Sequence, residues 1–192
     1  MMDSCRVITP RKFIDDRGFF CETWNRLTLE AEGIDVDFVQ DNLSLSLDIG
    51  TVRGLHCQMP PHAQAKLVRC SRGRLFDVAV DIRMGSPRFG QWIAEELSVE
   101  NGKQLFIPAG FLHGFITLEA NTEIMYKCSD YYAPDCDVSV RFDDPDIAID
   151  WPIETVRAIL SDKDDAALRF ADFQSPFVYE APSMKLLVTG GA

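Results

Sequence analysis

Apolar and polar residues alternate along most of this chain, and a helical period is confined to short stretches. In residues 76–83 the large apolar side chains fall on every second position, which is typical of a strand with one face against a core. Similar short runs recur at residues 18–25, 38–47, 67–70, 92–99, 104–107, 114–118 and 124–131. The alternation therefore predicts at least eight strands.

Turn-forming residues separate these runs, as at 71–73, 85–87, 101–102 and 108–110. Many short strands at close spacing, without helices between them, favour a sandwich or barrel over a parallel α/β sheet. We expect helices only at the margins. One is expected at 25–32, and one or two within 153–170, where Ser161 precedes an acidic stretch and resembles an N-cap.

Length and composition favour a single cytoplasmic domain. The 192 residues are 46% hydrophobic and 26% charged, and no apolar run approaches the ~20 residues of a membrane-spanning helix. The first residues lack the unbroken apolar stretch of a secretory signal. The six cysteines lie far apart with no C-x-x-C pair, so we expect reduced thiols.

The net charge of −11 argues against nucleic acid or an anionic membrane as the main partner, because such surfaces repel an acidic protein. An anionic small molecule would need a local basic pocket. The residues that could form one are concentrated in a few segments of otherwise apolar alternation, and each segment alone is weak support for any function.

The order of these segments along the chain is more informative. They are DDRGFFCETW at 15–24, FVQDNLS at 38–44, VRGLHCQ at 52–58, AKLVRCSRGRLFDVAVDIR at 65–83, FGQW at 89–92, QLFIPAGFLHGF at 104–115 and YKCSDYYAP at 126–134. As an ordered set they resemble the dTDP-4-dehydrorhamnose 3,5-epimerase family, from about residue 6 to about residue 170.

This resemblance implies a mainly β fold, the double-stranded β-helix or cupin-like jelly roll, over residues 1–175. It also implies a homodimer and a reaction that uses no metal and no organic cofactor. The expected activity inverts C3 and C5 of dTDP-4-keto-6-deoxyglucose in dTDP-L-rhamnose biosynthesis.

Such an epimerisation needs a base to remove the proton beside the ketone, a positive group on the enolate oxygen and an acid on the opposite face. By the resemblance, His56 is the base and Asp164 is the carboxylate that orients it. Asp164 could instead only stabilise the first turn of a helix after Ser161, and its neighbours Asp162 and Asp165 are alternatives.

Lys66 is the expected enolate stabiliser, and Tyr126 is the expected acid. By strand parity the phenol shares a face with Ile124 and Cys128 and so points into the barrel. A solvated lysine and a buried, hydrogen-bonded tyrosine are the alternatives. Tyr126 favours inversion at both carbons; inversion at only C3 or C5, in a secondary-metabolite pathway, is the alternative within the family.

The remaining matched positions are expected to bind substrate. Arg53 and Arg17 could bind the two phosphates through their guanidinium groups. The other expected contacts to nucleotide and sugar are Glu22, Gln40, Asn42 and His113. Two reservations apply: His113 could be a core histidine, and strict alternation sends Arg53 and His56 to opposite faces unless the strand kinks at Gly54. His62, in a proline-broken loop, is expected to do no chemistry.

Two other classes of protein remain as alternatives. A metal-dependent cupin would need a histidine at position 58, which is Gln58, and Lys66 lies near where a carboxylate ligand would be expected. A non-catalytic barrel that only binds a nucleotide sugar would need no base and acid pair.

The tail from 176 to 192 departs from the family. Residues 184–192, MKLLVTGGA, resemble the first strand and glycine turn of a dinucleotide-binding Rossmann unit. We hypothesise that the chain is fused to, or partnered with, a nucleotide-sugar dehydratase or reductase that begins near Met184. An accidental hydrophobic tail is the alternative.

Overall fold

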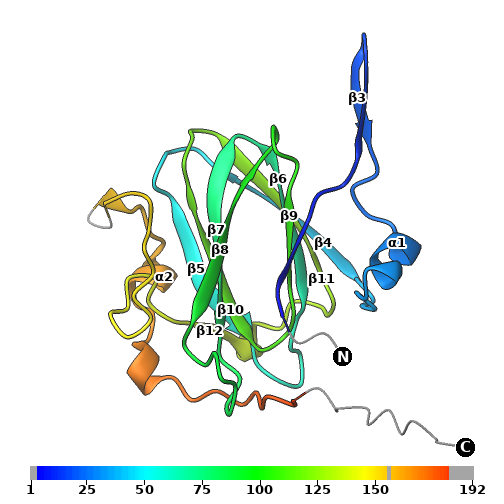
Figure 1. Cartoon of the computed structure of the whole chain (residues 1–192). Coiled ribbons are helices and arrows are strands. Elements are labelled where there is room, and N and C mark those ends of the chain that lie inside the picture. Colours follow the sequence, from blue (N-terminus) through cyan, green and yellow to red (C-terminus); the bar gives the residue numbers. More distant parts are fainter. Residues whose placement is uncertain (1–3, 155–156, 182–192) are drawn as a thin grey trace, which may run out of the picture.

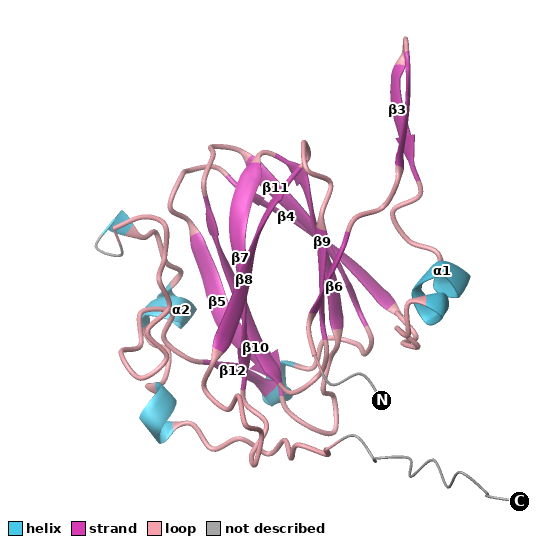
Figure 2. Cartoon of the chain, in the orientation of Figure 1, coloured by secondary structure: helices cyan, strands magenta, loops and turns pink. Residues whose placement is uncertain are grey.

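The alternating residues form two antiparallel five-stranded sheets that face each other (Figures 1 and 2). The computed structural model describes residues 4–154 and 157–181. In order across the first sheet, the strands are β1 (Arg6–Ile8), β9 (Gln104–Ile107), β6 (Lys66–Arg72), β11 (Thr122–Cys128) and β4 (Gln40–Ser46). Across the second they are β12 (Asp137–Ser139), β5 (Val52–Gln58), β10 (Phe111–Thr117), β7 (Arg74–Asp81) and β8 (Trp92–Ser98). This is the expected mainly β jelly roll.

Every one of the eight predicted strand regions contains a strand. The structure adds four strands that alternation did not single out: β1, β5, β12 and β2 (Lys12–Asp15), which pairs with β3 (Gly18–Cys21). Three of these four have only three or four residues, too few for a period of two to stand out. The fourth, β5, contains Gly54, which interrupts its pattern.

The main core lies between the two sheets, where their inward-facing apolar side chains meet. Its buried members are Val68, Cys70, Leu75, Ala79, Leu97, Leu105, Ile107, Phe115 and Ile124. The outer face of the second sheet is covered by the chain after β12, which contributes Phe142, Ile147 and Trp151. Both faces of this sheet are therefore buried, which gives β5, β10 and β7 a fixed backbone on which to hold polar side chains.

Short helices lie at the margins as expected. Helix α1 (Arg26–Ala31) is capped by the Asn25 side chain and packs Leu29 on the outer face of the first sheet. Among described residues, the 153–170 region forms α2 (Asp162–Asp165), which has only four residues and is capped by Ser161. Two 3-10 turns, η1 (Pro134–Cys136) and η3 (Phe170–Asp172), complete the helical elements named here. In the described part of the chain, no helix is long and apolar enough to cross a membrane.

The β2–β3 hairpin extends away from the barrel (Figure 1). It exposes Phe13, Ile14, Phe19 and Phe20, whose exposed fractions run from 50% to 80%. Four large apolar side chains on one small hairpin are unusual for a surface that stays in water.

At the other end of the chain, residues 176–181 run along the barrel, and Val178 forms a bridge with Met84. The predicted Rossmann-like segment, 184–192, lies outside the described residues. The division into a 1–175 domain and a tail stays a prediction.

Candidate active site

A bulge in β5 sets the direction of its polar side chains. Against β10, His56 of β5 pairs with His113, but Arg53 pairs with Phe115, so β5 has one residue more than its partner over this interval. Gly54 lies in the bulge with φ of +116°, and a Cβ there would lie 2.6 Å from the His113 carbonyl oxygen. Only glycine fits this position.

The bulge removes the parity difficulty between Arg53 and His56. Leu55 and Cys57 pack in the outer core of the sheet. Arg53 reaches Ser46 on the facing sheet, and His56 lines a cavity between the sheets. The kink that strict alternation required at Gly54 is thus present, and both polar residues face the barrel interior.

The imidazole of His56 is held by a carboxylate from outside the barrel. Its Nε2 lies 2.5 Å from Oδ1 of Asp164 in α2. Asp164 also accepts hydrogen bonds from the Ser161 hydroxyl, at 2.8 Å, and from the Gly54 backbone N–H, at 3.4 Å. Both readings of Asp164 therefore apply together, since it lies in the first turn of a helix and also binds His56. Its neighbours Asp162 and Asp165 are exposed.

Buried carboxylates resist ionisation, but Asp164 is an exception. Burial raises the pKa of this carboxyl, but the hydrogen bond and charge of His56, together with the Ser161 hydroxyl and the Gly54 N–H, hold the pKa below its usual range. Its side chain is 4% exposed, whereas that of His56 is 25% exposed. A shielded carboxylate that is ionised at neutral pH thus holds a histidine that remains accessible.

The cavity that His56 enters has a volume of about 310 Å³ and is formed by both sheets. Lys66 from β6 and Tyr126 from β11 line it together with His56. The Lys66 ammonium lies 5.8 Å from the centroid of the Tyr126 ring. As parity predicts, Tyr126 shares its face with Ile124, a member of the inner core.

Burial shifts the pKa values of Lys66 and Tyr126 in opposite directions. It lowers the pKa of Lys66, and the negative charges of Cys128, Cys57, Asp137 and Asp77, where ionised, oppose this effect. Burial raises the pKa of Tyr126, so the phenol keeps its proton at neutral pH. Within the described residues, the Lys66 ammonium has no ion-pair partner, so its charge is directed at the cavity.

A second histidine and carboxylate pair lies beside the first. His113 Nε2 is 2.8 Å from Oδ1 of Asp77, and the two side chains are 8% and 0% exposed. Burial lowers the pKa of His113 despite the opposing effect of Asp77, so the imidazole is neutral at pH 7. His113 thus has a buried position beside His56, its register partner, and its role stays a prediction.

Two of the expected substrate-binding residues line the cavity, and a third contacts the same strand, β4. Gln40 and Asn42 on β4 line it, and the Gln40 amide donates to the Asn42 side-chain oxygen at 3.0 Å. Arg53 is exposed and bonds Ser46 and the Leu45 carbonyl on β4. These three residues provide amides and one cation on the side of the cavity near β4.

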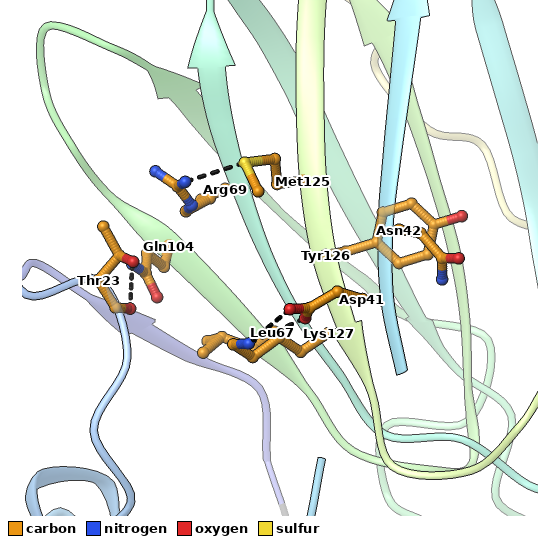
Figure 3. Close-up of a pocket in the computed structure, with 9 residues that line it drawn as sticks. All are labelled: Thr23, Asp41, Asn42, Leu67, Arg69, Gln104, Met125, Tyr126 and Lys127. Atoms are coloured by element: carbon orange, nitrogen blue, oxygen red, sulfur yellow. Dashed lines mark hydrogen bonds and ion pairs between the residues drawn. The ribbon is translucent and has the colours of Figure 1, made fainter. Parts of the chain in front are cut away.

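Asn42 and Tyr126 also border a shallow groove next to the cavity (Figure 3). They are register partners on β4 and β11 and lie side by side. On the same two strands, Asp41 and Lys127 form an ion pair at 2.8 Å in this groove. Asp41 and Lys127 line only the groove, whereas Asn42 and Tyr126, which follow and precede them on the strands, border both the groove and the cavity.

Comparison with known proteins agrees with this geometry. The family model described as dTDP-4-dehydrorhamnose 3,5-epimerase matches residues 1–172. A dTDP-4-dehydrorhamnose 3,5-epimerase of Sinorhizobium fredii is 51% identical over 174 residues, which cover 91% of this chain and 89% of the relative. The chain belongs to the dTDP-4-dehydrorhamnose 3,5-epimerase family.

Solved structures of similar epimerases share the fold. The dTDP-6-deoxy-D-glucose-3,5-epimerase of Legionella pneumophila, in complex with dTDP-4-keto-L-rhamnose, is 45% identical and has a TM-score of 0.88, covering 94% of this chain and 96% of that one. ChmJ, a 3'-monoepimerase of Streptomyces bikiniensis in complex with dTDP-quinovose, is 34% identical, with a TM-score of 0.81 and coverages of 87% and 84%. The same fold thus serves double and single epimerases.

Two of the expected substrate-binding residues of this epimerase lie away from the cavity. Arg17 lies on the hairpin, with a side chain that is 90% exposed and paired with Asp15 at 2.6 Å. Glu22 borders a different pocket, near the base of the hairpin and α1. A single chain does not bring them together with His56, and their roles stay predictions.

Several residues that line the cavity of the epimerase were not among those expected to bind substrate or to take part in the reaction. They are Cys57, Gln58, Gln64, Cys128, Tyr132 and Asp137. A signal for Gln58 was present, because strand alternation places position 58 on the same face as His56. Asp137 lies in the three-residue strand β12, opposite Gln58, and no periodicity pointed to it.

The metal-dependent cupin alternative depends on position 58, where the side chain has another use. The Gln58 amide donates to the carbonyls of His62, at 2.7 Å, and Tyr131, at 3.1 Å, and accepts from the Ala133 N–H at 2.7 Å. It therefore joins two loops at the rim of the cavity. Among described residues, no group of three or more His, Cys, Asp or Glu side chains is arranged to hold a metal ion.

His62 lies in one of those loops. Its Nδ1 is 3.2 Å from Asp130, and its side chain is 46% exposed. Its partner is a surface carboxylate. The expectation that His62 does no chemistry stays a prediction.

Proposed function

We propose that this chain is a dTDP-4-dehydrorhamnose 3,5-epimerase that inverts C3 and C5 of a dTDP-linked 4-keto-6-deoxy sugar. The observation that carries the proposal is the convergence of His56, Lys66 and Tyr126 on one cavity, with Asp164 bound to His56. A general base, a cation and a general acid are the three groups that this reaction requires.

The first step removes a proton from C3 or C5, next to the C4 ketone. Because a carboxylate can only accept, Nε2 of neutral His56 carries its proton toward Asp164 and Nδ1 keeps the lone pair. That nitrogen takes the carbon-bound proton, and the electron pair moves to the C4 oxygen to form an enolate. Asp164 then stabilises the resulting imidazolium.

The enolate oxygen is stabilised by the Lys66 ammonium, and a proton returns to the carbon from Tyr126 on the opposite face. The raised pKa of the phenol suits this role, since it keeps the group protonated until the carbanion forms. Proton transfer from imidazolium to phenolate, through solvent, resets the pair before the second carbon reacts. The chain itself supplies every group in this scheme, so we propose no metal and no organic cofactor.

Binding of the nucleotide part rests on the β4 side of the cavity. Arg53 is placed to bind the diphosphate, and Gln40 and Asn42 to contact nucleotide or sugar. Arg53 carries one positive charge, which only partly balances the charge of two phosphates. A second cation would strengthen the binding of the diphosphate.

We propose that a second copy of the chain supplies that cation. The apolar hairpin projects from its own barrel, and β4 is the edge strand of its sheet, with Leu43 and Leu45 exposed at 61% and 45%. The apolar hairpin of one copy would cover the exposed edge strand of the other. In a homodimer that exchanges hairpins, Arg17 and Glu22 would reach the partner's cavity.

Complementation tests the exchanged site. A chain carrying His56→Ala retains Arg17, and a chain carrying Arg17→Ala retains His56. If the site combines residues of two chains, the mixed dimer recovers one intact site and up to half of the wild-type activity per dimer. If each site is built from one chain, mixing recovers no activity.

Proton NMR tests the reaction itself. Incubation of the enzyme with dTDP-4-keto-6-deoxyglucose in deuterated water should replace the protons at both C3 and C5 with deuterium and yield the doubly inverted sugar. Inversion at C3 alone would move the chain to the single epimerases. A cytoplasmic location is part of the proposal and agrees with the six free cysteines.

A further inference from the structure

The carboxylate that holds His56 has a second oxygen, and a serine donates to it. Oδ1 of Asp164 lies 2.5 Å from Nε2 of His56 and also accepts from the Gly54 N–H. Oδ2 accepts from the hydroxyl of Ser161 at 2.8 Å, and among the described residues this hydroxyl is its one donor. Because a carboxylate is planar, the contact at Oδ2 also sets the direction in which Oδ1 points.

The surroundings of Ser161 leave its hydroxyl proton a single direction. The serine oxygen accepts a hydrogen bond from the backbone N–H of Asp164 at 3.2 Å, as the N-cap of α2. The hydroxyl has one proton to donate, and an ionised carboxylate can only accept, so this proton goes to Oδ2. Ser161 and Asp164 are thus joined by two hydrogen bonds that run in opposite directions.

The backbone that carries Ser161 is attached to the second sheet on both sides. Before the serine, Ile159 forms a bridge with Thr51, next to the start of β5. After α2, Leu168 forms a bridge with Val140, which follows β12. Because the segment is held at both ends, the hydroxyl approaches the carboxylate from a fixed position.

The serine also lies between the carboxylate and solvent. Ser161 is exposed, whereas the side chain of Asp164 is 4% exposed. Burial raises the pKa of the Asp164 carboxyl, and the hydrogen bonds from His56 and Ser161 are among the contacts that lower it. A water molecule in place of the hydroxyl would supply a donor without a fixed direction.

We propose that Ser161 is a positioning residue for the epimerisation and acts on His56 through Asp164. Its hydroxyl fixes the rotation of the carboxylate, so that Oδ1 meets the Nε2–H of His56 and Nδ1 faces the substrate with its lone pair. Ser161 itself touches no reacting atom. The kinetic consequence rests on the proposed function, whereas the effect on the His56 imidazole is independent of substrate.

Steady-state kinetics provides the first test. Ser161→Ala removes the donor to Oδ2 but no contact to substrate, so kcat should fall about fivefold to thirtyfold while KM changes less than about twofold. Ser161→Thr keeps a hydroxyl that can cap the helix and donate, so it should retain at least about a third of the wild-type kcat.

A second comparison separates positioning from capping of the helix. Glycine is tolerated at an N-cap, so Ser161→Gly should unfold in urea close to the wild-type midpoint although it lacks the hydroxyl. Its kcat should therefore fall as far as that of Ser161→Ala. A kcat that follows the urea midpoint, with a loss in the alanine variant and none in the glycine variant, would overturn the inference.

Ser86 provides a matched control outside the cavity. Its hydroxyl donates to Oδ2 of the buried Asp81 at 2.7 Å, and its oxygen accepts from the Arg88 N–H at 3.1 Å. This carboxylate is paired with Arg83 and with no histidine. Ser86→Ala therefore removes the same kind of hydrogen bond, and it should leave both kcat and KM at the wild-type values.

Nitrogen NMR of the substrate-free protein, with isotopically labelled histidine, measures the effect on the imidazole directly. At about pH 8, above the ordinary titration range of histidine, the ring nitrogen shifts distinguish a proton on Nε2 from one on Nδ1. A His56→Ala sample assigns the His56 signals. The wild-type protein should show mainly the Nε2–H form of His56, and Ser161→Ala should raise the share of the Nδ1–H form severalfold.

The outcomes distinguish this inference from the proposed function. Unchanged kcat or an unchanged tautomer in Ser161→Ala would overturn the inference. Equal losses in Ser161→Ala and Ser161→Thr would overturn it as well, because the hydroxyl would then not be the decisive group. Failure of the wild-type protein to epimerise the keto sugar, with a tautomer that still depends on Ser161, would count against the proposed function and support the contact with His56.

Discussion

Two histidine and carboxylate pairs lie side by side in this barrel, and they differ in almost every respect except their chemistry. His56 and His113 are register partners on neighbouring strands. His56 is held by Asp164, which comes from a helix outside the barrel, and is a quarter exposed. His113 is held by Asp77 of the adjacent strand and is almost fully buried.

Under the proposed function, access to the cavity, rather than pairing with a carboxylate, distinguishes the base from the other histidine. Asp164 reaches His56 from behind, through the bulge at Gly54, so the other side of the imidazole remains open to the cavity. His113 is enclosed on all sides, and burial keeps it neutral, as its lowered pKa indicates. His56 is therefore accessible from the cavity, whereas His113 is almost completely shielded.

The largest expected effect comes from removing the accessible imidazole. His56→Ala should lower turnover by about a thousandfold or more and abolish exchange of the C3 and C5 protons, because no other described base occupies its place. Affinity for dTDP should be nearly unchanged. Deuterium incorporation followed by NMR, with calorimetry for affinity, measures both quantities. Continued exchange would show that His56 is not the base.

The second-largest effect is expected from removing the negative charge of the carboxylate that holds His56. Asp164→Asn should lower turnover by about a hundredfold to a thousandfold, because an amide does not stabilise the imidazolium and can favour the wrong tautomer. The Michaelis constant should change little. Steady-state kinetics separates the two constants. The exposed neighbour provides a matched control, since Asp162→Asn should leave turnover close to that of the wild type.

The buried pair should respond mainly in stability. Asp77→Ala leaves the Nε2–H of His113 without an acceptor and opens a small void, so the free energy of unfolding should fall by about 2–4 kcal/mol. Urea denaturation measures it. The exposed carboxylate Asp143 is the comparison, because Asp143→Ala should cost less than about 1 kcal/mol. Equal losses in the two variants would contradict the assigned difference in burial.

The sequence predicted the fold well because alternation is a local signal. Seven of the eight expected regions hold strands of the two main sheets, and 104–107 has the predicted bounds. The same signal failed for β5, where the bulge at Gly54 breaks the period, and for the three-residue strands β1 and β12. These failures matter because β5 and β12 carry His56, Gln58 and Asp137.

The site was only partly accessible to sequence reasoning, because its pairs are remote in the chain. Asp164 lies 108 residues after His56, and only the resemblance to a family suggested that they meet. Parity correctly turned Tyr126 inward, since β11 has no bulge between 124 and 128. Nothing local indicated Asp77 as the partner of His113, because a carboxylate alternating with apolar residues is also the pattern of a solvent-facing position.

The smallest expected effect is a pH dependence that the buried pair alone should produce. Burial lowers the pKa of His113 in the folded protein. Below about pH 6.5, the unfolded chain therefore binds a proton at this histidine, whereas the folded chain leaves the imidazole neutral. The contribution of neutral His113 to the free energy of unfolding is therefore fully present above the pKa of the unfolded state. It is lost as the pH falls toward the lower pKa of the folded state. Denaturation curves between pH 7.5 and 5 should show this decline, and His113→Gln, which cannot titrate, should reduce it. His62→Gln is the control: this histidine lies on the surface, with a side chain that is 46% exposed. Its variant should follow the wild-type decline, and an equal flattening in both variants would remove the distinction between the buried histidine and the exposed one.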